Sequence, residues 1–109
     1  MDIETREYKR ATIFRVSGRV DASTAPEFDS QIKALAEAGR PVVLELDATS
    51  YLSSAGVRAL ISAQKVLKGR GARLAIAQPS VRVREVLKIA GLEPIFELFD
   101  TTEAAVGSL

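Results

Sequence analysis

The sequence predicts an α/β fold with a mixed β-sheet of four to five strands and about four helices. Short runs of branched apolar residues alternate with longer segments whose apolar residues recur at helical spacing. The first two strand-like runs follow one another directly, so the expected order is β-β-α-β-α-β-α-β-α, with an antiparallel pair at the start. Because 109 residues suffice for one core and not for two, we expect a single domain over residues 1–109.

The first two predicted strands lie at the beginning of the chain. Residues 3–8 alternate weakly between apolar and polar side chains, which is typical of an edge strand. Residues 9–10 form the expected turn, and residues 12–16 form a strand rich in β-branched and aromatic residues. We expect Gly18 to end this second strand.

A first helix is predicted from residue 24 onward. Thr24 and Glu27 have the spacing of a capping box, in which the two side chains bind free amides at a helix start. Pro26 suits the first turn of this helix, and Gly39 suits its C-terminal end. The apolar stripe at helical spacing comprises Phe28, Ile32, Leu35 and Ala36.

The most informative stretch is the middle of the chain. Residues 42–46 are nearly all branched and apolar, as in a strand covered on both faces, and turn-forming residues follow at 47–50. The next apolar residues recur at helical spacing and are Val57, Leu60, Ile61 and Leu67. Ser53 and Ser54 lie where the periodicity changes, so we expect a hydroxyl group at a helix N-terminus.

The second half of the chain continues the alternation of strands and helices. Residues 73–77 are expected to form a short buried strand, and a third helix is expected to begin at Pro79. The apolar residues of that helix are Val83, Val86, Leu87 and Ala90. Residues 95–99 form the last predicted strand, and Asp100 or Thr101 caps a final short helix. The sequence leaves open whether the helices cover one face of the sheet or both.

The composition argues against several classes of function. The chain has no Cys and no His, which removes thiol nucleophiles, the Ser-His-Asp triad and the commonest metal ligands. Fifteen basic and fourteen acidic residues leave a net charge of +1, which predicts no general attraction to nucleic acid or to anionic membranes. No apolar run approaches the roughly eighteen residues of a membrane span, and the polar start is unlike a signal peptide. We therefore expect a cytoplasmic, non-enzymatic protein without a metal or another cofactor.

The paired serines have two interpretations. Serine is a favoured N-cap residue, worth about 0.5–2 kcal/mol over alanine, and capping needs only one of the two. The other hydroxyl is then free to accept a phosphate, which adds about −1.5 to −2 charges at pH 7. The free amides and the dipole of a helix start tolerate such a charge. The modification would then leave the helix intact and repel a partner docked beside it.

Asp21 and Asp47 follow two predicted strands, at the edge where ligands gather in open α/β sheets. Two carboxylates near a serine are compatible with catalysis. Without His, however, a serine hydrolase would need a Lys base, and no Ser-x-x-Lys pattern surrounds Ser53 or Ser54. We therefore interpret both Asp residues as turn and cap residues, and a small enzyme is the least favoured class.

The middle of the chain resembles the STAS domain of bacterial anti-sigma factor antagonists. The resemblance rests on residues 44–47 followed by residues 51–57, Tyr-Leu-Ser-Ser-Ala-Gly-Val. Residues 18–21, Gly-Arg-Val-Asp, are similar to the family's second landmark, between the second strand and the first helix. The resemblance covers essentially the whole chain and implies a STAS-like fold with no catalytic residue.

This resemblance implies a switch protein. Such an antagonist binds an anti-sigma factor that is also an ATP-dependent serine kinase, and the binding frees a sigma factor. Phosphorylation of a serine at the start of the second helix breaks the complex, and a phosphatase resets it. Aligning the family's Asp-Ser-Ser-Gly on residues 53–56 makes Ser54 the expected acceptor, with Ser53 as the alternative. The expected partner-binding residues are Asp21, Ala22, Thr24, Ser53, Ala55, Gly56 and Arg58.

Two departures from the family pattern keep a second function open. Ser53 stands where the family usually has Asp, and Ala55 stands where it has a second Ser. The lost carboxylate removes a negative charge beside the acceptor. This favours the alternative of a STAS-like scaffold or accessory subunit in a signalling or a lipid- or anion-transport complex, where no phosphorylation is required.

Overall fold

The computed structural model describes residues 1–109, with six strands and four helices. In chain order these are β1 (Asp2–Tyr8), β2 (Ala11–Val20), α1 (Ala25–Ala38), β3 (Val42–Glu45), β4 (Thr49–Leu52), α2 (Ser54–Gly69), β5 (Leu74–Ala77), α3 (Val81–Ile89), β6 (Glu97–Phe99) and α4 (Thr102–Gly107). No helix is both long enough and apolar enough to cross a membrane.

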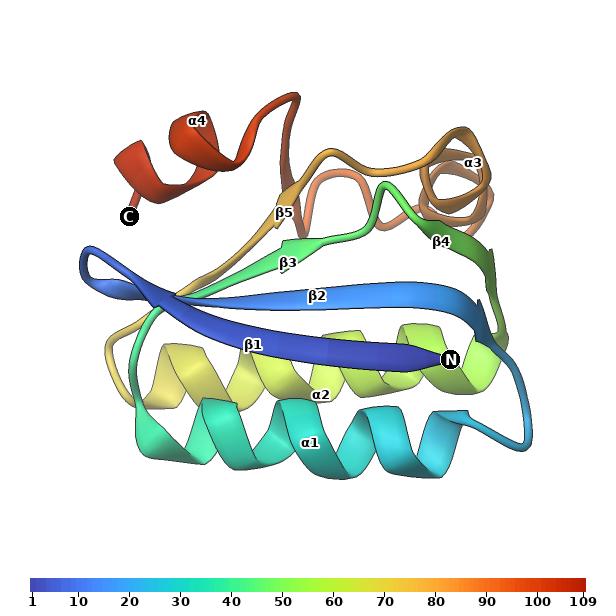
Figure 1. Ribbon diagram of the computed structural model, residues 1–109, viewed down its shortest axis with the longest axis horizontal. Coiled ribbons are helices and arrows are strands. Elements are labelled where there is room, and N and C mark those ends of the chain that lie inside the picture. The colour runs from blue at the N-terminus through green and yellow to red at the C-terminus, as the bar shows by residue number, and fades with distance from the viewer.

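The strands form one mixed sheet (Figure 1). Its order is β1-β2-β3-β5-β6, and β4 pairs with the last part of β2. β1 and β2 are antiparallel, whereas all other pairs are parallel, so the predicted fold class and the antiparallel start are confirmed. β4 is an additional strand in a stretch where the sequence predicted mainly turn chemistry. Its four residues, of which one is exposed Ser50, are too few to show a strand periodicity.

The prediction that Gly18 ends the second strand is wrong, because β2 continues through it to Val20. Gly18 has a φ of +91°, which a residue with a side chain rarely adopts. The strand pairs with β3 up to Arg15 and with β4 from Gly18 onward, and its register shifts between Gly18 and Arg19. Gly18 therefore allows the bend at which β2 changes its pairing from β3 to β4.

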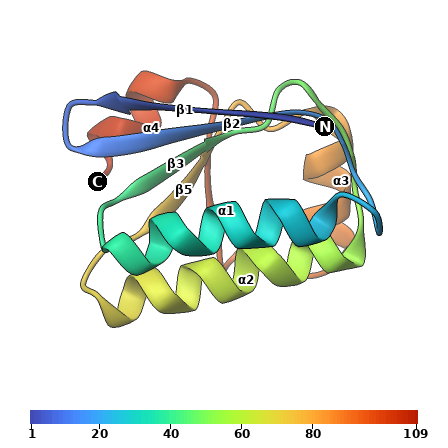
Figure 2. The same ribbon diagram turned by 60° about the horizontal axis from the view of Figure 1, so that its bottom comes forward.

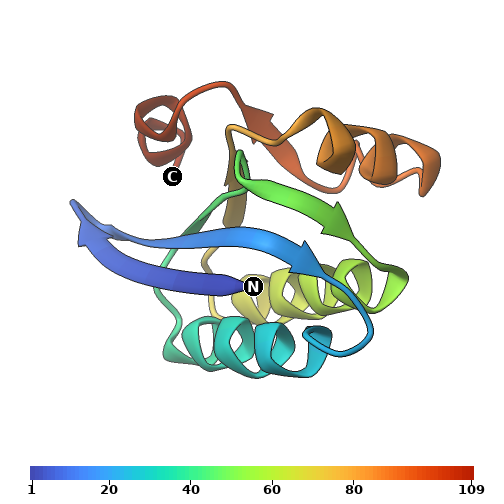
Figure 3. The same ribbon diagram turned by 45° about the vertical axis from the view of Figure 1, so that its right-hand side comes forward.

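The helices are divided between the two faces of the sheet, which the sequence left open. α1 and α2 lie side by side on one face (Figure 2). The larger apolar core lies under them, where the rings of Phe14 and Phe28 meet edge to face at 6.0 Å. α4 packs on the opposite face over Ile13 and Val43, and α3 packs against β4 (Figure 3).

Two of the predicted helix ends are confirmed and two are wrong. Gly39 follows α1 in the left-handed conformation, and the Thr101 side chain caps α4, as expected. α3 begins at Val81, after its cap Ser80, and not at Pro79. The capping box at α1 is not formed, because the Thr24 hydroxyl donates to the Arg19 carbonyl and accepts from an amide in its own loop.

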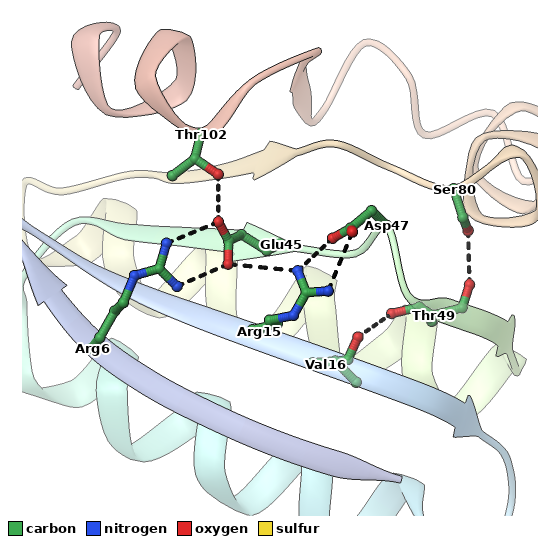
Figure 4. Close-up of polar contacts among 8 residues, drawn as sticks. All are labelled: Arg6, Arg15, Val16, Glu45, Asp47, Thr49, Ser80 and Thr102. Atoms are coloured by element: carbon green, nitrogen blue, oxygen red, sulfur yellow. Dashed lines mark hydrogen bonds and ion pairs between the residues drawn. The ribbon is translucent and has the colours of Figure 1, made fainter.

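One buried carboxylate joins the edge of the sheet to α4 (Figure 4). The side chain of Glu45 is 6% exposed and accepts two hydrogen bonds from Arg6, at 3.0 and 3.1 Å. Arg15 lies 3.8 Å from the same carboxylate, and the Thr102 hydroxyl donates a short hydrogen bond to it. Arg6, Arg15, Glu45 and Thr102 are called the Glu45 cluster below.

Candidate functional site

The predicted site residues lie at the end of the sheet where β2 and β4 finish (Figures 1 and 3). Two hydrogen bonds hold the elements there together (Figure 4). The buried Thr49 hydroxyl of β4 donates to the Val16 carbonyl of β2 at 2.9 Å. The Ser80 hydroxyl donates to the Thr49 carbonyl at 2.8 Å, which fastens the start of α3 to β4. The short strand β4 thus carries the chain from the core to the start of α2.

The structure shows which of the two serines caps α2. Ser53 has an extended backbone, and its hydroxyl accepts from the Gly56 amide at 3.2 Å, so Ser53 is the N-cap. Its own amide donates to the Val20 carbonyl at 2.8 Å, which ties the helix start to the end of β2. Ser54 is the first helical residue and is exposed. Its hydroxyl is not needed for capping and projects at the surface.

Gly56 has a structural role that the sequence did not reveal. It is buried, and a Cβ atom at this position would lie 2.7 Å from Leu52 Cδ1 and 2.9 Å from Val20 Cγ1. The absence of a side chain therefore lets the first turn of α2 lie directly on the ends of β2 and β4. This packing accounts for a glycine here by itself, and contact of Gly56 with a partner stays a prediction.

Asp21 organises the loop before α1. One of its oxygens accepts from the Ser23 hydroxyl at 2.8 Å and from the Ser23 and Thr24 amides at 3.0 and 3.2 Å. The pKa of Asp21 lies below its usual value, chiefly because the Ser23 hydroxyl bonds to the charged carboxylate. Its interpretation as a turn residue is confirmed. Thr24, from the same loop, is also half-buried and occupied with loop contacts.

Asp47 lies in the turn between β3 and β4, as expected, but its side chain caps no backbone amide there. Its carboxylate instead accepts from two nitrogens of Arg15, at 2.6 and 3.2 Å (Figure 4). Hydrogen bonding to Asp47 raises the pKa of Arg15 above its ordinary value.

A groove of about 540 Å³ separates the first turns of α1 and α2. It brings together three of the predicted partner-binding residues, namely Ala22, Ala55 and Arg58. Its other lining residues are Ala25, Pro26, Asp29, Ala59 and Ser62. We call it the α1–α2 groove. The small side chains on both helices leave this space open.

A second groove, of about 360 Å³, lies between α2 and α3 and is called the α2–α3 groove. Its lining residues are Ser54, Val57, Arg58, Val86, Ile89 and Ala90. Ile89 is 87% exposed, although it is large and apolar. Ile89 was not among the residues predicted from the sequence. Ile89 lies outside the apolar stripe that was predicted for the third helix. A large apolar side chain off the buried face of a helix is a sign of a contact surface, and this sign was present in the sequence.

Arg58 lines both grooves and forms no ion pair. It is exposed and lies one helical turn after Ser54, and the first turn of α2 contains no acidic residue. Arg19, the arginine before the Asp21 loop, is engaged differently. Its guanidinium lies 4.4 Å from the Tyr51 ring and 3.7 Å from the Asp21 carboxylate. Arg58 is therefore a cation free to meet another molecule.

Comparisons with known proteins agree on one family. The family model of the STAS domain matches residues 2–105. The chain is 32% identical over 94 residues to BtrV of Bordetella bronchiseptica, a protein named as a candidate anti-sigma factor antagonist. That match covers 85% of this chain and 81% of BtrV. The anti-sigma-B factor antagonist of Staphylococcus aureus is 26% identical over 104 residues, covering 94% of this chain and 96% of that protein.

Solved structures show the same fold. An anti-sigma factor antagonist from Mycobacterium paratuberculosis matches with a TM-score of 0.88 at 23% identity, over 98% of this chain and 92% of that one. The antagonist SpoIIAA in its unphosphorylated form matches with a TM-score of 0.82 at 20% identity, over 98% and 95%. The phosphorylated form of SpoIIAA, from Bacillus, matches with a TM-score of 0.76 at 19% identity, over 98% of both chains.

Proposed function

Since the chain belongs to the STAS domain family, we propose that it is an anti-sigma factor antagonist that binds a kinase-type anti-sigma factor and thereby releases a sigma factor. Phosphorylation of Ser54 ends the binding. The observation that carries this proposal is the exposed hydroxyl of Ser54 at the first position of α2, beside a neighbouring serine that already caps the helix. The protein acts here as a regulator and not as an enzyme.

The proposed switch transfers one phosphoryl group. The bond between the γ-phosphorus of ATP and its bridging oxygen breaks, ADP leaves, and the Ser54 oxygen forms a new bond to phosphorus as it gives up its proton. The product carries about −1.5 to −2 charges at pH 7 on the surface of the helix start. A phosphatase resets the switch when water attacks the phosphorus, which frees inorganic phosphate and restores the hydroxyl.

The partner would contact the ridge between the two grooves. Ser54 and Arg58 lie on this ridge, Ala22 and Ala55 line the α1–α2 groove, and Ile89 offers an apolar contact in the α2–α3 groove. Asp21 and Thr24 support this surface indirectly, because their side chains hold the loop that carries Ala22. A dianion on Ser54 would then face the partner's groups across a close interface, where an unpaired charge is costly.

Names of relatives support this proposal. The relative from Staphylococcus aureus is named for the anti-sigma-B factor, and SpoIIAA has been solved both with and without phosphate. A partner of the same kind, an anti-sigma factor with ATP-dependent serine kinase activity, is therefore the candidate to test. We place this exchange in the cytoplasm, where sigma factors act.

The test of the switch is intact mass spectrometry after incubation with ATP and the anti-sigma factor of the same organism. The wild-type protein should gain one phosphate, and Ser54→Ala should gain none. Ser53→Ala is the matched control, because it changes the neighbouring hydroxyl and leaves the acceptor in place. A phosphate that persists on Ser54→Ala and disappears from Ser53→Ala would move the acceptor to Ser53.

Affinity provides the second measurement. Ser54→Asp should weaken binding to the anti-sigma factor by about tenfold or more, since it introduces an unpaired charge into the interface, whereas Ser54→Ala should bind like the wild type. Calorimetry or surface plasmon resonance would measure both variants. Equal affinity of the two variants would contradict the proposed switch.

A second candidate function, a scaffold or transport accessory without phosphorylation, is favoured by Ser53. Asp and Ser are about equally good N-caps, so Ser53 keeps the helix start and removes the charge that the family usually places beside the acceptor. If no kinase phosphorylates the protein while a partner still binds the ridge, this second function is preferred.

A further inference from the structure

Arg58 and Ser54 are placed to meet on the surface of α2. They are four residues apart in one helix, where side chains are neighbours with Cβ atoms about 5–6 Å apart. Helical side chains lean toward the N-terminus of their helix, so Arg58 leans toward the turn that carries Ser54. Both residues are exposed, and both line the α2–α3 groove.

The Arg58 guanidinium forms no ion pair with any carboxylate of the protein. The first turn of α2 has no acidic residue, and the carboxylate of Asp21 is taken up by Ser23, Thr24 and Arg19. Asp29 lines the α1–α2 groove together with Arg58, but no ion pair joins them. By contrast, the guanidinium groups of the Glu45 cluster are both engaged by carboxylates.

We propose that Arg58 binds the phosphate on Ser54 within the same molecule. This inference rests on the proposed function, because it takes Ser54 as the modified residue. An acidic group four residues before a basic one has the favourable orientation for a helix pair, and a guanidinium forms charge-assisted hydrogen bonds to phosphate. The free amides at the helix start act in the same direction.

This contact changes how the switch works. In the unmodified protein, Arg58 is a free cation between the two grooves and faces the partner. In the phosphorylated protein, its donors turn to the phosphate, so the partner loses a cation at the same time as it meets an anion. The modification also stabilises α2, since it adds an internal ion pair to the first two turns.

The experiment uses protein with phosphoserine installed at position 54 during synthesis, so it needs no kinase. Phosphorus NMR follows the second pKa of the phosphoserine, which is about 6 in the absence of neighbours. With Arg58 present this pKa should be lower, and Arg58→Gln should raise it by about 0.3 pH units or more. Arg58→Lys should restore part of the shift, because it keeps the charge without the planar fork.

The matched control is Arg82→Gln, which removes an exposed arginine from α3 that lies 3.9 Å from Glu85. It should leave the phosphoserine titration unchanged. Thermal unfolding gives a second readout: phosphoserine at position 54 should raise Tm, and by less in Arg58→Gln. Identical titrations in the wild type and Arg58→Gln would overturn the inference.

The two proposals fail in different ways. If the kinase does not modify Ser54 while the installed phosphate still titrates under the control of Arg58, the proposed function is contradicted and the internal ion pair stands. If the kinase modifies Ser54 and the pKa of the phosphoserine is the same with and without Arg58, the proposed function stands and the internal ion pair is overturned.

Discussion

The Glu45 cluster and the ridge at the start of α2 are both polar, but their groups are satisfied in opposite ways. Glu45 is enclosed and receives hydrogen bonds from Arg6 and Thr102, with Arg15 close by. On the ridge, the Ser54 hydroxyl is exposed and Arg58 has no carboxylate partner. Open grooves flank the ridge, whereas α4 contributes Thr102 to the cluster.

The difference separates structural chemistry from chemistry for binding. A buried charge is tolerated only when its partners are in place, so removing one of them destabilises the fold. Exposed polar groups without partners contribute little to folding, and they are free to change their contacts. Substitutions in the cluster should therefore affect stability, and substitutions on the ridge should affect binding.

The largest effect on stability is expected from Glu45→Ala. The substitution leaves Arg6 and Thr102 without their shared acceptor, and we expect the free energy of unfolding to fall by about 2–3 kcal/mol in urea denaturation. Glu97→Ala is the control, because it removes an exposed carboxylate that pairs with Arg73, and it should cost less than about 1 kcal/mol. Equal losses in the two variants would show that the buried carboxylate contributes no more to stability than the exposed one.

Acid should lower the free energy of unfolding by part of the loss that is expected for Glu45→Ala. The pKa of Glu45 lies below its usual value, chiefly because Arg6 donates hydrogen bonds to the carboxylate. Its stabilisation is thus complete above the unfolded pKa of about 4.3 and is lost as the pH falls through the lower folded pKa. Thermal unfolding between pH 6 and pH 3 should show a steeper fall in Tm for the wild type than for Glu45→Gln. Parallel curves would contradict this.

A smaller loss is expected at the N-cap. Ser53→Ala removes the acceptor for the Gly56 amide and should lower the free energy of unfolding by about 1 kcal/mol. Ser53→Asp should retain the wild-type stability, since a carboxylate caps equally well and its charge suits the helix start. If Ser53→Ala left the free energy of unfolding unchanged, another group would have to cap α2.

The smallest effect is expected one residue later. Ser54→Ala should change the free energy of unfolding by no more than about 0.5 kcal/mol, because its hydroxyl is exposed and is not the cap. Measured side by side in urea, the two alanine variants distinguish a structural serine from one available for modification. A loss at Ser54 as large as that at Ser53 would show that both hydroxyls support the helix.

Sequence patterns over a few residues predicted much of the candidate site. The change of periodicity placed Ser53 and Ser54 at a helix start, and the family resemblance named Ala22 and Ala55, which the structure brings together in the α1–α2 groove. Gly56 was assigned to the same surface, and the structure adds that this glycine packs against the core. The sequence does not show that Gly56 packs against Val20 and Leu52, and only the tertiary structure reveals these two neighbours.

The sequence by itself determined the α/β class, the strand–helix alternation and the exposed serine at the start of α2. These follow from periodicity and turn chemistry, which act between residues close together in the chain. The tertiary structure decided the bend at Gly18, the short strand β4, the Glu45 cluster and the groove beside Ile89. Each of these depends on side chains distant in sequence, as Arg6 is from Glu45, and their meeting is set only when the sheet and its helices pack together.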